Sequence, residues 1–157
     1  MKFIAVIFLS AVLFGCQTTS GTSSIQSMQK RQLLEKILEY DYDLVYNSAI
    51  TVILDQGYNI KNIDKNNGLI VAEKFAERRQ WGLVAYDRDA FKASIVLNPL
   101  EGQRTKVRYG IVKITYSSLG YGEHVKGVQE IVDPSISYAF FTMLISETEK
   151  SKVGLNK

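Results

Sequence analysis

The chain has 157 residues, a formal net charge of +3 at pH 7, one cysteine and one histidine. A single cysteine excludes an internal disulfide, and one cysteine with one histidine excludes a zinc site of the usual Cys/His spacing. The charge is too small and too dispersed to predict nucleic-acid binding. Gly-rich phosphate-binding motifs are absent, so no cofactor is expected.

The N-terminal segment is typical of an exported protein. Lys2 precedes an apolar run at residues 3–14, and the small residue Gly15 follows it. The run is shorter than the roughly 20 residues that a helix needs to span a bilayer. Charge, apolar run and small residue in this order are typical of a secretory signal, so we expect residues 1–15 to be a signal peptide that is removed.

Residues 13–16 read LFGC, which resembles the lipobox of bacterial lipoproteins. The resemblance implies that Cys16 becomes the acylated first residue of the mature protein. Several acyl chains on one residue are enough for stable membrane anchoring. Gln17 follows in place of Asp, and by the same resemblance this favours the periplasmic face of the outer membrane. The membrane is therefore one expected partner, reached through the lipid.

The chain after Cys16 divides into a linker and one domain. Residues 16–27 are rich in Ser, Thr and Gly, which predicts a flexible tether. Residues 28–157 are enough for a single domain with its own core. At the start of this domain, residues 29–40 fit an amphipathic helix, although an opening strand remains an alternative.

The middle of the chain predicts a helix followed by a hairpin. Asp43 is a candidate cap for a helix that runs to Gln56 and ends at Gly57. Strands are predicted at residues 58–63 and 69–75, with a turn between them. The next stretch, residues 76–90, is polar and has no clear period, which predicts an exposed loop.

The last third of the chain predicts strands and a closing helix. Strands are expected at residues 91–97, 105–116 and 123–132, and a helix is expected from Pro134 to about Lys150. In the second strand the apolar positions change phase at Gly110, which predicts a β-bulge that returns them to the core. The whole pattern predicts an α+β, two-layer sandwich, in which two helices pack on one face of an antiparallel sheet of four to five strands.

Several short motifs resemble those of a family of small, uncharacterised bacterial lipoproteins. They are MQKRQ at residues 28–32, VYNSAITVILDQG at 45–57, GLIVAEK at 68–74, TKVR at 105–108 and YAFF at 138–141. The order of elements is also similar to that of domains of an accessory lipoprotein of the outer-membrane β-barrel assembly machine. The resemblance implies a fold and a location, and it carries over no catalytic residue.

Residues suited to catalysis or metal binding are few. His124 lies beside Glu123 near a Gly-rich turn, but no local motif marks a nucleophile, and an exposed strand residue is the favoured interpretation. Two D-x-D pairs, at residues 41–43 and 87–89, lack the other ligands of a calcium loop. Helix capping and solvation explain them better. Neither an enzyme nor a metal site is therefore expected.

The basic residues suggest a binding surface instead. Lys106, Arg108 and Lys113 lie along one predicted strand, and the predicted loop contains Arg78, Arg79 and Trp81. Such side chains can bind an acidic envelope protein or an anionic envelope polymer, although a simply solvated face is the competing interpretation. We therefore expect a non-enzymatic binding or scaffolding module of the cell envelope. A structural subunit of an envelope assembly, or an envelope enzyme using His124, is the alternative.

Overall fold

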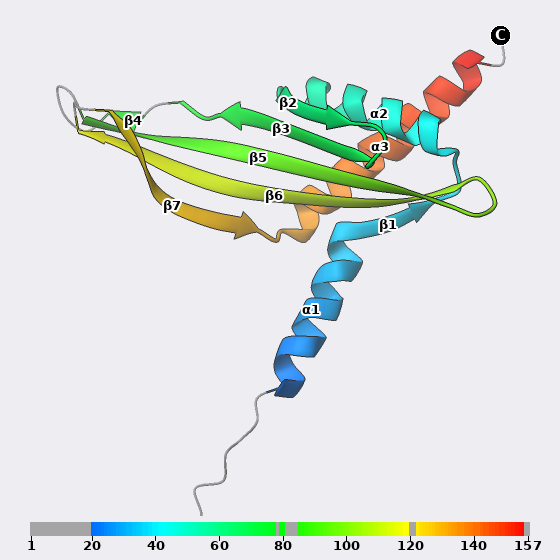
Figure 1. Cartoon of the computed structure of the whole chain (residues 1–157), viewed down its shortest axis with the longest axis horizontal. Coiled ribbons are helices and arrows are strands. Elements are labelled where there is room, and N and C mark those ends of the chain that lie inside the picture. The colour runs from blue at the N-terminus through cyan, green and yellow to red at the C-terminus, as the bar shows by residue number, and fades with distance from the viewer. Residues whose placement is uncertain (1–19, 78, 81–84, 120–121, 156–157) are drawn as a thin grey trace, which may run out of the picture.

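The computed structural model describes residues 20–77, 79–80, 85–119 and 122–155, and it is an α+β protein built on an antiparallel sheet (Figure 1). The predicted signal peptide at residues 1–15 and Cys16 lie outside the described residues. In chain order the elements are α1 (Ser20–Leu34), β1 (Glu35–Leu38), α2 (Tyr42–Asp55), β2 (Asn59–Asp64), β3 (Leu69–Phe75), β4 (Arg79–Gln80), β5 (Ala85–Leu100), β6 (Arg104–Leu119), β7 (Glu123–Ile131) and α3 (Pro134–Leu155).

The sheet has seven strands, so the expectation of four to five was wrong. Its main path runs β1-β6-β5-β3-β2, while β4 pairs with β5 and β7 pairs with β6. The cause is the length of the two central strands, β5 and β6, which have 16 residues each. A strand of this length can pair with two shorter strands along one edge. β6 thus holds β1 at one end and β7 at the other.

The N-terminal part of the structure departs from the predicted tether. α1 begins at Ser20, inside the range 16–27 for which a flexible linker was expected, and it projects away from the sheet (Figure 1). Its last residue, Leu34, is buried, and Lys30 forms a 2.6 Å ion pair with Glu130 of β7. These contacts hold the base of the helix against the domain. The two alternatives for residues 29–40 are both realised in part, since α1 is followed directly by β1.

α2 is fixed by local signals at both ends. Asp41, rather than the predicted Asp43, caps its N-terminus and accepts a 2.9 Å hydrogen bond from the backbone N–H of Asp43. At the other end Gly57 has a φ of 77°, and its N–H donates to the carbonyl of Leu54. The N–H of Tyr58 donates to the carbonyl of Ile53. The two bonds form a Schellman motif, which turns the chain into β2.

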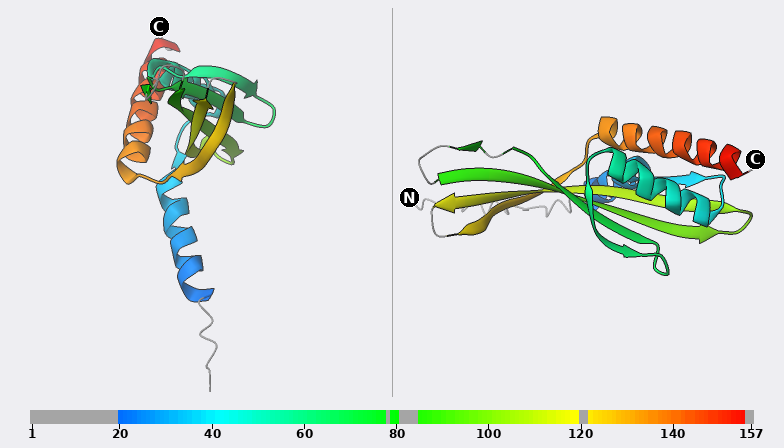
Figure 2. Two further views of the ribbon diagram at one scale, coloured as in Figure 1. Left: turned by 90° about the vertical axis from the view of Figure 1, so that its left-hand side faces the viewer. Right: turned by 90° about the horizontal axis from the view of Figure 1, so that it is seen from above.

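The core lies between the helices α2 and α3 and one face of the sheet, which we call the helix face. Figure 2 shows both helices on this face, over the part of the sheet that contains β1 and the β5–β6 turn. Tyr109 of β6 stacks on Phe140 of α3 with ring centroids 3.9 Å apart. Burial raises the pKa of the Tyr109 hydroxyl. The other face of the sheet, which we call the open face, is contacted by the end of α1, where Leu34 lines a hollow together with Ser94 and Gly110, whereas α2 and α3 lie on the helix face.

The predicted loop at residues 76–90 is wrong over most of its described length. Arg79–Gln80 forms β4, and β5 begins at Ala85. Asp89 and Ala90 are buried, although the stretch is polar in sequence. Polar side chains can occupy a strand when their hydrogen-bonding groups have partners, and here the partners come from other strands.

The predicted bulge at Gly110 is also wrong. β5 and β6 keep one register from the pair Ala85–Leu119 to the pair Leu100–Arg104, and Gly110 lies directly opposite Ser94. The register shift lies between β6 and β7 instead, where Lys126 is the extra residue. The second apolar phase of β6 is therefore not returned to the core. It lies on the open face.

None of the helices in the described ranges is both long enough and apolar enough to cross a bilayer.

Candidate binding groove at the edge strand β1

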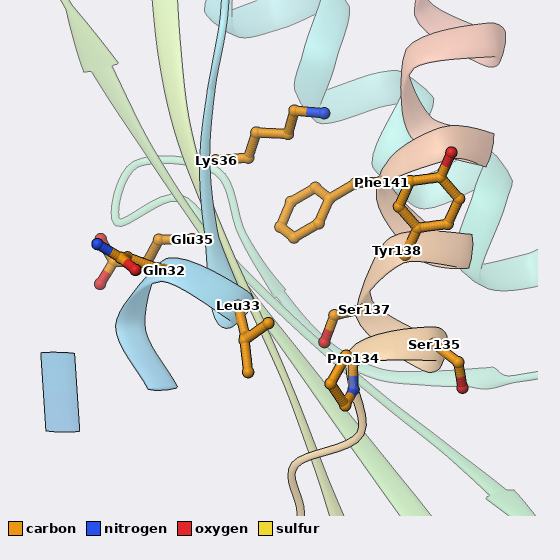
Figure 3. Close-up of a pocket in the computed structure, with 9 residues that line it drawn as sticks. All are labelled: Gln32, Leu33, Glu35, Lys36, Pro134, Ser135, Ser137, Tyr138 and Phe141. Carbon is orange, nitrogen blue, oxygen red and sulfur yellow. The ribbon is translucent and has the colours of Figure 1, made fainter. Parts of the chain in front are cut away.

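A groove of about 590 Å³ lies between β1 and the first turns of α3 (Figure 3). Phe141 projects from α3 towards β1, and Lys36 extends from β1 towards α3. The residues that line the groove are Gln32, Leu33, Glu35, Lys36, Pro134, Ser135, Ser137, Tyr138 and Phe141. An apolar hollow with a few polar groups at its margin is typical of a binding site.

The side of the groove formed by α3 is positioned by the cap of that helix. Asp133 accepts hydrogen bonds from the backbone N–H of Ser135, at 2.8 Å, and from its hydroxyl, at 2.7 Å. The hydrogen bonds from the Ser135 side chain and backbone hold the pKa of Asp133 below its ordinary value. With Pro134 as the first helical residue, this cap fixes the direction of α3. Tyr138 is consequently presented at the mouth of the groove with 76% of its surface exposed.

A second hollow, of about 310 Å³, lies along the same strand. It is lined by Arg31, Gln32, Glu35, Lys36, Ile37 and Lys106. Ile37 faces the side opposite to Lys36, because successive residues of a strand point to opposite faces. Half of the Ile37 surface is exposed. The two hollows share Gln32, Glu35 and Lys36, so together they flank β1.

β1 is the end strand of the main path of the sheet. One of its edges pairs with β6, from Glu35–Arg108 to Leu38–Thr105, and no other described strand pairs with it. An unpaired strand edge presents backbone N–H and C=O groups that can pair with an added strand. The side chains of an added strand would alternate between the two sides of the sheet, where the two hollows lie.

The charges around β1 are predominantly positive. Glu35 forms a 3.0 Å ion pair with Lys106. Arg31 and Lys36 form no ion pair with any residue in the described ranges. A ligand that carries a carboxylate would find two available cations here, one on each side of Glu35 in the sequence.

The structure separates the three basic residues predicted on β6. Lys106 and Arg108 both point to the open face, but Lys113 points to the helix face, because it is an odd number of residues away. Lys113 forms a 3.1 Å ion pair with Asp89. The predicted single basic surface of the three residues was therefore wrong. Arg108 lines a smaller hollow of about 190 Å³ on the open face.

Asp89 is the centre of a polar cluster on the helix face, beyond the helices. Its carboxylate accepts hydrogen bonds from the Thr115 hydroxyl at 2.7 Å and from Arg79 at 3.0 Å, and it pairs with Lys113. Burial by itself raises the pKa of Asp89, but the Thr115 hydrogen bond and the charges of Lys113 and Arg79 outweigh it, so the pKa is lowered. Arg79 thus has a structural partner. Arg78 and Trp81, predicted beside it, lie outside the described residues.

The candidate catalytic residue His124 lies on β7, exposed and opposite Ser117. The carboxylate of its neighbour Glu123 accepts hydrogen bonds from Tyr86 and Arg88. His124 does not line the groove at β1. The part of the chain that the structure describes contains no group of three or more His, Cys, Asp or Glu residues that could hold a metal ion.

The D-x-D pairs make local contacts. Asp41 caps α2, and Asp43 forms an ion pair with Lys65 at 2.9 Å. In the other pair, Asp87 binds Lys126 at 3.0 Å, and Asp89 belongs to the cluster described above. Each pair therefore has structural contacts of its own.

Sequence patterns did not indicate the groove. Its two sides come from residues 32–36 and 134–141, which are about a hundred positions apart in the chain. Leu33 and Phe141 have the appearance of ordinary core residues in the sequence, and only the tertiary structure places them at a shared hollow. The exposed Tyr138, within the YAFF motif, was the one available signal.

No protein-family model matches the chain, and no curated protein matches it by sequence. Among solved structures, one neighbour is the crystal structure of a DUF4468 family protein from Bacteroides ovatus ATCC 8483. The two chains are 9% identical, and the match covers 73% of this chain and 84% of that chain with a TM-score of 0.38. This weak likeness assigns no family. The resemblance to small bacterial lipoproteins and to the barrel-assembly lipoprotein stays a prediction.

Proposed function

We propose that the protein is a non-enzymatic binding module of the cell envelope, anchored to the periplasmic face of the outer membrane through a lipid on Cys16. In this proposal β1 binds an extended segment of an envelope protein. The observation that supports it most directly is the pair of hollows on the two sides of β1, a strand whose outer edge pairs with no strand among the described residues. Strand addition uses backbone hydrogen bonds for affinity and such hollows for specificity.

The chemistry of the bound segment follows from the side chains around β1. Leu33, Ile37 and Tyr138 offer exposed apolar surface, which favours apolar side chains in the ligand. Arg31 and Lys36 favour at least one carboxylate. The proposed ligand is thus an extended segment with alternating apolar residues and an acidic residue.

The proposal can be tested in cells by photo-crosslinking. A benzophenone amino acid is placed at Ile37 or Tyr138 of the full-length protein, and at Val153 as a control that is exposed on α3. We expect Ile37 and Tyr138 to capture the same envelope protein, and Val153 not to capture it. Capture should be lost in a Lys36→Glu background and kept in a Lys150→Glu background, since Lys150 lies at the far end of α3. Equal capture at all three positions, or none at β1, would contradict the proposal.

A further inference from the structure

The apolar residues of β6 change sides along the strand. Val107, Tyr109 and Ile111 point to the helix face and are buried in the core. Further along, Ile114 and Tyr116 point to the open face. The helices end near this point, and the sheet continues beyond them (Figure 2). Gly110 therefore lies near the point along β6 at which the apolar side chains pass from the helix face to the open face.

Neighbouring strands make the same change at the same place. Phe75 of β3 lies opposite Ala90 of β5, Ala90 lies opposite Ile114 of β6, and Ile114 lies opposite Val128 of β7. Four strands thus contribute one apolar residue each to a single row on the open face. Tyr116 and Val125 form a pair next to this row. We call these residues the open-face patch: Phe75, Ala90, Ile114, Tyr116, Val125 and Val128.

The open-face patch does not continue the hydrophobic core of the helix face. On the helix face at the same level, the residues are polar, with Asp89, Lys113 and Thr115 in one cluster. Three members of the patch are strongly exposed: Phe75 by 45%, Val125 by 55% and Val128 by 66%. Val125 and Val128 lie together on β7, whereas Phe75 lies on β3, and on the strands between them Ala90 is buried and Ile114 is partly exposed. Apolar side chains gathered on one face of a sheet mark an interaction site more often than isolated apolar residues do.

The charges beside the patch favour an acidic partner. Three glutamates on this side already have basic partners, in the ion pairs Arg88–Glu123, Lys61–Glu73 and Lys30–Glu130. Two open-face cations, Lys92 and Arg108, form no ion pair with any residue in the described part of the chain. The open face is therefore left with an excess of positive charge.

Each of these two cations lies at a hollow of the open face. Lys92 lines one of about 360 Å³ together with Ile114 and Tyr116 of the patch. Arg108 lines the hollow of about 190 Å³ together with Gly110 and Val112. Lys92 is directly opposite Val112, so the two hollows adjoin along β5 and β6. They continue the patch towards β1.

We propose that the open face docks an amphipathic helix of a partner protein, whose apolar stripe covers the open-face patch and whose acidic side chains bind Lys92 and Arg108. A helix is about 10 Å wide, which matches two or three strands about 4.8 Å apart. Arg108 lies opposite Val96, four residues from Lys92, a separation of roughly 13 Å along the strands. Two acidic residues about two helical turns apart span this separation.

A second copy of this chain fits the open face less well than an acidic helix. Two copies would bring the same cations together, while Glu73, Glu123 and Glu130 are already engaged in ion pairs. The docking site is also separate from the groove at β1, so the inference does not depend on the proposed function. Lys36→Glu distinguishes the two sites, because it should impair binding at β1 and leave binding at the open face unchanged.

The test uses a synthetic amphipathic helical peptide with a leucine stripe and two glutamates seven residues apart, and a matched peptide with lysines at those two positions. Binding to the purified full-length protein is measured by fluorescence anisotropy. We expect the glutamate peptide to bind at least tenfold more tightly than the lysine peptide. Lys92→Glu with Arg108→Glu should reverse this preference, and Val128→Asp should weaken both peptides. Lys150→Glu and Lys36→Glu should change neither.

Three results would overturn the inference. The first is equal binding of the two peptides, and the second is a preference that survives reversal of Lys92 and Arg108 in a variant with an unchanged circular dichroism spectrum. The third is another occupant of the patch. Sedimentation that detects a dimer lost in Val128→Asp would assign the patch to self-association, and binding to phosphatidylglycerol vesicles lost in the same variant would assign it to a lipid surface.

Discussion

The backbone carbonyl of Gly68 accepts a 2.8 Å hydrogen bond from the backbone N–H of Leu97, which brings the β2–β3 turn against β5. Gly68 has a φ of 63°, and a Cβ atom at this residue would lie 1.9 Å from the Leu97 carbonyl oxygen. Gly68→Ala should therefore lower the free energy of unfolding by about 3 kcal/mol or more, through backbone strain and a steric clash. Urea denaturation measures this change.

Gly57→Ala is the matched control for that substitution. Gly57 also has a positive φ, but nothing lies within 4 Å of the position of its Cβ. The loss should be only about 1 to 2 kcal/mol, because backbone strain acts alone. Equal losses for the two variants would show that the close approach of Gly68 to Leu97 does not restrict residue 68.

Gly110 should tolerate a side chain. The nearest atom to an added Cβ is the Ser94 hydroxyl oxygen, at 3.6 Å, which is an ordinary contact. A glycine in the middle of a strand costs about 0.5 to 1 kcal/mol relative to alanine, so Gly110→Ala should raise the free energy of unfolding by about that amount. A decrease of this size would instead support a special backbone conformation at Gly110.

Asp89→Asn should destabilise the protein in a pH-dependent way. At pH 7 we expect a loss of about 1 to 3 kcal/mol, because Lys113 and Arg79 lose their shared carboxylate. Since the pKa of Asp89 is lowered on folding, its contribution is complete above about pH 4 and is lost as the pH falls through the lowered value.

The difference between the urea midpoints of the wild type and Asp89→Asn should therefore stay constant from pH 7 to about pH 4 and shrink as the pH falls below about 4. Asp55→Asn is the control, because Asp55 is exposed and should change stability by less than about 0.5 kcal/mol. A difference between wild type and Asp89→Asn that does not shrink below about pH 4 would mean that the ionised carboxylate does not stabilise the cluster.

Cys16→Ser should prevent membrane anchoring. In cells fed with a fatty-acid probe, the wild type should carry the label and sediment with membranes, and the variant should do neither, because serine provides no thiol for the lipid. Label and sedimentation that both persist in the variant would exclude the lipoprotein assignment.

The elements that the sequence predicted well are those set by local signals. α2 and the β2–β3 hairpin depend on a cap at Asp41, the positive φ of Gly57 and the tight turn at Gly68, all of which lie next to the elements that they delimit. The strand at residues 85–90 was missed because its polar residues depend on distant partners. Asp89, for example, accepts a hydrogen bond from Thr115, which is 26 residues away in the chain.

The change of phase at Gly110 was visible in the sequence, but its interpretation was wrong. A bulge was inferred on the assumption that all apolar residues of a strand face one core. The β5–β6 register shows two apolar surfaces on opposite faces of one long strand. The same limitation applies to the groove, whose sides come from distant segments.

The connection between α1 and β1 determines how the domain would respond to mechanical force. α1 projects from the sheet and continues directly into β1, whose four residues are held along one edge by β6 (Figure 1). A pull on the N-terminal end of α1 would first load the Lys30–Glu130 ion pair and the buried Leu34, and would then peel β1 from β6 one pair at a time, beginning at Glu35–Arg108. Tension applied through α1 would thus dismantle the groove while the core beneath α2 and α3 stayed intact.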